Sequence, residues 1–106
     1  MVIFLSYPMN GKSKHEQDIT RMKMRQALAS QGYGTNNVIV HNGFCIEKPN
    51  AGRLYYLGHA ITLMDTCDAV AFHPGWTKAK GCQVERKVAE VYGLQIIDLD
   101  MEGGDE

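Results

Sequence analysis

The sequence is poor in the features that mark several common classes of protein. Its three cysteines are odd in number and form no Cys-x-x-Cys pair, which argues against both a disulfide framework and a zinc cluster. The net charge of −1 gives no basic surface for nucleic acid or for an anionic membrane. No stretch approaches the roughly 20 apolar residues of a membrane span. We therefore expect a cytoplasmic protein in a reducing compartment, with a small molecule as its ligand.

The composition is that of one ordinary globular domain. The chain has 106 residues, of which 44% are hydrophobic and 22% charged. The apolar run at its start, Val2 to Leu5, is too short for the core of a signal peptide. We expect the domain to span residues 1–100 and residues 101–106 to form a flexible acidic tail.

Apolar runs and helical periodicity alternate along the chain. Ser13 and Glu16 have the spacing of a capping box, and Gly32 and Gly34 follow the helix that this box would begin. The predicted strands are Val2–Leu5, Val38–Val40, Ala69–Phe72 and Ile96–Leu99, and the predicted helices run from Ser13 to about Gln31, from Leu54 to Asp65 and from Gly81 to Tyr92. The remaining stretch, from Asn42 to Arg53, is predicted to be a long loop.

This βαβαβαβ order predicts a single-domain, doubly wound α/β fold of the flavodoxin or Rossmann type. We expect four parallel strands in the order 2-1-3-4, with helices on both faces. In such sheets ligands bind beyond the carboxyl ends of the strands. The loops at that edge are Ser6–Lys12, His41–Arg53 and His73–Lys80.

Two of the predicted helices have informative faces. The Leu54–Asp65 helix carries one apolar stripe through Leu57 and Ile61 and a second through Ala60, so it needs two partners. One partner is the sheet, and a second copy of the protein is the other, which predicts a homo-oligomer; a helix wrapped within a monomer is the alternative. In the last helix, Val84, Val88 and Val91 are predicted to face inward.

The strongest site candidates lie around the His73–Lys80 loop. We expect Trp76, the only tryptophan, to lie in this mobile loop and to stack on a base, or else to fold over the end of the helix. Glu85 is expected in the first turn of the following helix, where it could attack a sugar carbon or simply complement the helix dipole. Lys78 and Lys80 are candidates for a phosphate contact, although such lysines are more often solvated.

Other signals carry less weight. His41, His59 and His73 lie on three different elements without metal-ligand spacing, so we predict no metal and no cofactor. The run Asn10-Gly11-Lys12-Ser13 is similar to the end of a phosphate-binding loop, but no glycine stands five residues before Gly11.

Several of these segments together resemble the nucleoside 2-deoxyribosyltransferase superfamily, most closely its short phage and bacterial branch. The match covers nearly the whole chain, strongly in its C-terminal half and weakly from Asn36 to Arg53. A glycine is usual in the superfamily where Tyr7 stands. The matching residues are Ser6-Tyr7-Pro8-Met9-Asn10-Gly11, Cys67-Asp68-Ala69-Val70, Pro74-Gly75-Trp76, Lys80-Gly81, Glu85, Ala89, Gly93 and Ile96-Ile97.

The resemblance implies a reaction and exposes one departure from it. In the enzymes of that superfamily, a glutamate at the position of Glu85 attacks C1′ of a deoxynucleoside, and the sugar then passes to a second base or to water. Their catalytic aspartate stands eight residues before the residue matched by Asp68, where this chain has Ala60. His59 and Asp65 are near in sequence, but neither is a clean substitute.

Three hypotheses follow. The first is an N-glycosidic hydrolase or transferase for nucleosides or nucleotides with Glu85 as its nucleophile, and the second is a catalytically silent nucleotide-binding module that lacks the second carboxylate. The third is an assembly subunit that works through the Leu54–Asp65 helix. The expected cleft residues, besides Glu85, are Ser6, Tyr7, Pro8, Asn10, His59, Pro74, Gly75, Trp76 and Gly81.

Overall fold

A four-stranded parallel sheet forms the centre of the molecule. The computed structural model describes residues 1–9, 11–34, 38–41 and 52–101. Its strands are β1 (Val2–Ser6), β2 (Ile39–His41), β3 (Ala69–Phe72) and β4 (Gln95–Asp98). They are hydrogen-bonded in the order β2-β1-β3-β4, and every pair is parallel. The predicted doubly wound α/β class and the strand order are both confirmed.

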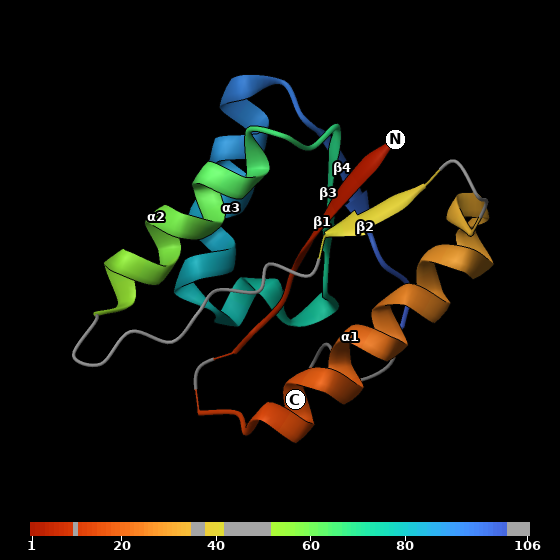
Figure 1. The fold of residues 1–106 in the computed structure, drawn as a ribbon, viewed down its shortest axis with the longest axis horizontal. Coiled ribbons are helices and arrows are strands. Elements are labelled where there is room, and N and C mark those ends of the chain that lie inside the picture. The colour runs from red at the N-terminus through yellow and green to blue at the C-terminus, as the bar shows by residue number, and fades with distance from the viewer. Residues whose placement is uncertain (10, 35–37, 42–51, 102–106) are drawn as a thin grey trace.

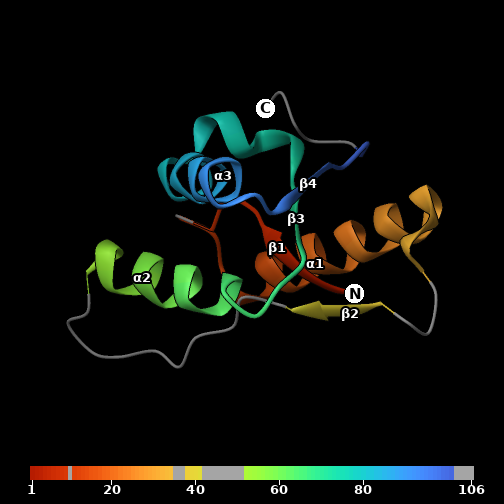
Figure 2. The same ribbon diagram turned by 90° about the horizontal axis from the view of Figure 1, so that it is seen from above.

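Helices cover both faces of this sheet. Figure 1 shows α1 on one side and α2 and α3 on the other, and Figure 2 shows the same layers from above. Their bounds agree with the sequence prediction to within a few residues at each end, and most of the predicted loop from Asn42 to Arg53 lies outside the described residues. The helices are α1 (Lys14–Leu28), which continues into a π-helical turn (Ala29–Tyr33), α2 (Arg53–Met64), a 3-10 helix η2 (Pro74–Lys78) and α3 (Lys80–Tyr92).

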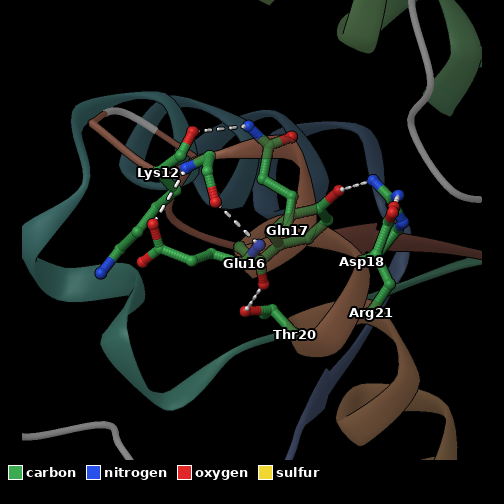
Figure 3. A network of polar contacts seen from close by, with 8 residues as sticks. Lys12, Glu16, Gln17, Asp18, Thr20 and Arg21 are labelled. Atoms are coloured by element: carbon green, nitrogen blue, oxygen red, sulfur yellow. Dashed lines mark hydrogen bonds and ion pairs between the residues drawn. The ribbon is translucent and has the colours of Figure 1, made fainter.

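The start of α1 is fixed by the capping box that the sequence predicts. Ser13 Oγ accepts from the backbone N–H of Glu16, and the Glu16 carboxylate accepts from the backbone N–H of Ser13, both at 3.1 Å. Figure 3 also shows the Gln17 side chain reaching back to the Lys12 carbonyl, at 3.2 Å. These bonds fix the direction in which the chain enters α1 after the loop that follows β1.

The core consists of one apolar cluster on each face of the sheet. Side chains alternate along a strand, so Ile3 and Leu5 of β1 pack toward α1, whereas Phe4 packs toward α2 and α3. Ala69 and Ala71 of β3 join the α1-side cluster. Burial on both faces explains why β1 and β3 read as continuous apolar runs. Met101 also packs against the α1-side cluster, and residues 102–106 of the predicted tail lie outside the described residues.

The inward face of α3 differs from the prediction. Val84 and Val91 are 41% and 65% exposed, so their expected inward orientation is wrong, and only Val88 packs partly against the core. The buried residues of α3 are Cys82, Glu85 and Ala89, which are spaced three and four residues apart. The face of α3 that lies against the sheet thus consists of small or polar side chains. Hydrophobic periodicity cannot identify such a face.

Each of the two apolar stripes predicted for α2 has a buried member. Met64, on the stripe through Leu57 and Ile61, and Ala60, on the other stripe, lie in the apolar cluster on this face of the sheet, whereas Leu54, at the start of the first stripe, is 80% exposed. None of the described helices is long and apolar enough to cross a membrane.

Candidate functional site

The chain reverses its winding direction between β1 and β3, at the carboxyl ends of these two strands. Doubly wound sheets generally bind ligands in a crevice at such a switch point, and we call this place the β1/β3 crevice. Helix α1 leaves β1 toward one face of the sheet and α3 leaves β3 toward the other (Figure 1). The segments that follow the two strands meet here. The His73 backbone N–H donates to the Ser6 carbonyl at 2.9 Å, and a β-carbon at Gly75 would lie 3.4 Å from Pro8 Cγ. The structure thus brings together Ser6, Pro8, His73 and Gly75.

Glu85 projects from α3 toward this edge and is almost completely buried. It is only 6% exposed, and its Oε1 accepts a hydrogen bond of 2.6 Å from Ser6 Oγ. The residue lies in the second turn of α3, which begins at Lys80, so its predicted place in the first turn is wrong. Glu85 is therefore not a solvated carboxylate that complements the helix dipole but a buried acid tied to the end of β1.

The surroundings of Glu85 change its acidity. Burial raises the pKa of Glu85 from an ordinary 4.5 to about 7, and the hydrogen bond from Ser6 only partly opposes this effect. The neighbouring Cys82 thiol, which is also buried, has its pKa raised to about 12, so it stays protonated and unreactive at neutral pH. A carboxyl group that titrates near pH 7 can bind or release a proton under ordinary conditions.

Ser6 and Tyr7 are adjacent in sequence but point to opposite faces of the sheet. Ser6, 1% exposed, faces Glu85, whereas Tyr7, 4% exposed, packs in the α1-side cluster. The Tyr7 hydroxyl accepts from Arg21 at 2.8 Å, and Arg21 also pairs with Asp18 (Figure 3). Burial raises the pKa of Tyr7. Both side chains were expected to line an open cleft, and the structure places both in the interior.

Trp76 does not lie in a mobile loop. It belongs to η2, and the Arg86 guanidinium lies over its ring, 4.2 Å from the ring centroid, and 5.0 Å from that of Phe72. Two hydrogen bonds, of 2.6 and 3.2 Å, hold Arg86 to the Asp98 carboxylate at the end of β4. One face of the indole is therefore already covered by Arg86 of α3. This arrangement favours the alternative prediction, in which Trp76 folds over the helix.

His73 is a site residue that the sequence reasoning weighed only as a metal ligand. Its Nδ1 accepts from the Gly75 backbone N–H at 2.9 Å and so caps η2. The neutral ring then carries its proton on Nε2. Burial, together with the charge of Lys12, lowers the pKa of His73. The order His-Pro-Gly, with a capping side chain before a proline, was the signal that could have identified this role.

The other predicted residues are more scattered. His59 is half-buried on α2, Pro74 begins η2, and Asn10 lies outside the described residues. A β-carbon on Gly81, in the first turn of α3, would meet open space. Ala60, where the superfamily has its catalytic aspartate, is 7% exposed and lies in the apolar cluster beside α3. This position therefore supplies a methyl group among apolar side chains and no carboxylate.

Neither a metal site nor the hollow on the surface of α1 offers a better candidate site. Among the described residues, no three His, Cys, Asp or Glu side chains are grouped as metal ligands would be. A shallow hollow on the surface belongs to the outer side of α1, where its lining comes from a single helix: Asp18, Arg21, Met22, Arg25, Gln26 and Ala29. We therefore place the candidate site at the β1/β3 crevice, where several elements converge.

Comparison with known proteins identifies one family. Residues 1–98 match the family described as a domain of unknown function, DUF4406, and the chain belongs to it. No curated protein and no solved structure matches the chain.

Proposed function

We propose that the protein cleaves or transfers the N-glycosidic bond of a nucleoside or nucleotide, with Glu85 as its nucleophile. The observation that carries this proposal is a buried carboxyl group at the β1/β3 crevice, with one oxygen held by Ser6. The resemblance of the segments around Glu85 to nucleoside 2-deoxyribosyltransferases supplies the class of reaction. The proposed ligand is a small molecule, and neither nucleic acid nor a membrane is a proposed partner.

The proposed chemistry follows that of retaining glycosidases. The free oxygen of ionised Glu85 bonds to C1′ while the C1′–N bond breaks, and the base leaves with the bonding electrons and takes up a proton. Water or a second base then attacks C1′ and releases Glu85 as a carboxylate. Because the pKa of Glu85 is about 7, roughly half of the protein carries the ionised nucleophile at neutral pH.

A second candidate is a nucleotide-binding module without catalytic activity. The observation that favours it is Ala60, which is buried among apolar residues at the position where the superfamily has its aspartate. A methyl group cannot deliver a proton to the departing base. General acid–base help of this kind is typically worth 10²–10⁴-fold, so we expect even an active wild type to be slow.

The test compares base release by the wild type and by Glu85→Gln. Deoxynucleosides and their 5′-monophosphates are incubated with each protein, and free base is measured by chromatography. We expect Glu85→Gln to lose release altogether. Glu90→Gln, which changes an exposed glutamate on the same helix, should keep the wild-type rate. Equal release by wild type and Glu85→Gln would contradict the proposed nucleophile.

Binding is measured in the same samples through the fluorescence of Trp76, the only tryptophan. A saturable change with nucleotides but no free base would favour the binding module. Ala60→Asp then tests the missing carboxylate. It should raise base release, at some cost in stability, because it places a charge in the apolar cluster. A folded Ala60→Asp that binds a deoxynucleoside and still releases no base would also favour the binding module.

A further inference from the structure

We propose that Ser6 is a positioning residue that fixes one carboxylate oxygen of Glu85 and so directs the other toward the reacting carbon. This inference rests on the proposed function above. It assigns Ser6 a role different from the substrate contact that the sequence suggests.

The backbone of Ser6 lies at a rigid point of the fold. Ser6 is the last residue of β1 and pairs with Phe72 of the neighbouring β3. Its carbonyl accepts from the His73 backbone N–H at 2.9 Å. The alternation of side chains along β1 turns the Ser6 hydroxyl to the face that α3 covers. A group held in this way by two central strands has little freedom to follow a ligand.

Burial separates Ser6 from any ligand. With 1% of its surface exposed, Ser6 offers no area for contact with a substrate. Its hydroxyl donates to Glu85 Oε1 at 2.6 Å and lies near the Cys82 thiol, one turn earlier on α3. Cys82 is itself 3% exposed and closes the interior side of the cluster. The orientation of Glu85 is therefore set from inside the protein.

The hydrogen bond also acts on the charge of Glu85. Burial raises the pKa of Glu85, and the bond from Ser6 is the opposing effect. The titratable groups that respond to the charge of Glu85 are Cys82 on α3 and Tyr7 after β1, and both have raised pKa values. Since a hydroxyl donates more strongly to a carboxylate than to a neutral carboxyl group, Ser6 favours the form that attacks C1′.

The experiment removes the hydroxyl and follows Glu85 directly. The side-chain carboxyl carbon of Glu85 is titrated by carbon-13 NMR in the wild type, in Ser6→Ala and in Ser13→Ala. We expect the midpoint in Ser6→Ala to rise by about one pH unit, a tenfold change in the ionisation constant. Ser13→Ala also loses a hydrogen-bonding hydroxyl, but at the exposed start of α1, and should leave the midpoint unchanged.

Base release supplies the second measurement. The pH profile of Ser6→Ala should move upward together with the NMR midpoint. A folded Ser6→Ala with an unchanged midpoint would overturn the proposal, even if its rate fell, because that result would indicate a structural role only. Ser6→Cys, which keeps a weaker donor, is measured in parallel and should have an intermediate midpoint. If the midpoint shifts while the wild type releases no base, the proposed function fails and the control of Glu85 by Ser6 stands.

Discussion

At the scale of single residues, Glu85 is the group whose burial opposes folding most clearly. The pKa of its carboxyl group is about 7 in the folded protein, against an ordinary value of 4.5. The folded state therefore binds a proton more tightly than the unfolded state does. The stability that this group contributes is fully present below pH 4.5 and is lost as the pH rises through about 7.

We predict that Glu85→Gln removes this loss. The difference between the two pKa values corresponds to about 3 kcal/mol, so the free energy of unfolding of the variant relative to wild type should increase by up to that amount between pH 4.5 and pH 8. Urea denaturation at several pH values measures it. A parallel pH dependence of the two proteins would show that Glu85 is not a buried, protonated acid.

The comparison with Glu85→Gln also controls for His73. The pKa of His73 is lowered in the folded protein, so its contribution to stability has the opposite sign and increases as the pH rises through 6.5. Both proteins contain His73, so its contribution cancels when the free energy of unfolding of the wild type is subtracted from that of Glu85→Gln at each pH. Asp98, whose pKa the hydrogen bond from Arg86 lowers, affects only the acid end of the curve.

At the scale of elements, side chains connect segments that are distant in sequence. Arg86 of α3 lies over Trp76 of η2 and is bound to Asp98 of β4. Trp76 also contacts Phe72 edge to face, with ring centroids 6.1 Å apart. These contacts fix α3 against the ends of β3 and β4. They place Glu85, which precedes Arg86, at a defined position along the crevice.

Two glycines, one after the end of a helix and one inside a helix, test the backbone preferences of the chain. Gly93 follows α3 with a φ of 74°, a left-handed conformation that costs a residue with a β-carbon about 1 kcal/mol. Gly58 lies inside α2, where a β-carbon would meet open space. We predict that Gly93→Ala destabilises the protein by about 1 kcal/mol and that Gly58→Ala stabilises it by about 0.5–1 kcal/mol. Thermal unfolding measures both; shifts of the same sign would contradict this account.

At the scale of the whole molecule, apolar side chains remain on the surface of the layer formed by α2 and α3. Leu54 of α2 is 80% exposed, and Val91 and Tyr92 at the end of α3 are 65% and 79% exposed. Leu63, in contrast, packs partly against the core. A lysine at position 63 would therefore disturb folding, so Leu54 is the better residue with which to test association through α2.

We predict that the protein forms a homo-oligomer through α2. Light scattering at micromolar concentration should give a multiple of 11.8 kDa. Leu54→Lys should reduce this mass while the variant still folds, because in the protomer it changes only an exposed apolar side chain. Ile39→Lys changes a residue of β2 that is 62% exposed and should leave the mass unchanged. A wild-type mass of 11.8 kDa would exclude the oligomer.

The sequence by itself determined the architecture. Strands buried on both faces appear as uninterrupted apolar runs, and the Ser13 cap and Gly93 mark helix ends through local backbone chemistry. The alternation of strands and helices then leaves few connections open, so the order 2-1-3-4 could be predicted. The same reasoning identified Glu85 and Ser6 as residues near the carboxyl edge of the sheet.

Only the tertiary structure decided what those residues contact. That Ser6 faces Glu85 while Tyr7 faces α1 depends on how β1 is placed between two layers of helices. The burial of Cys82 and Glu85, and the exposure of Val84, depend on which face of α3 lies against the sheet. The pKa of Glu85 follows from that burial, because desolvation comes from atoms of many segments at once. No local pattern in a sequence shows the combined desolvation that these segments produce.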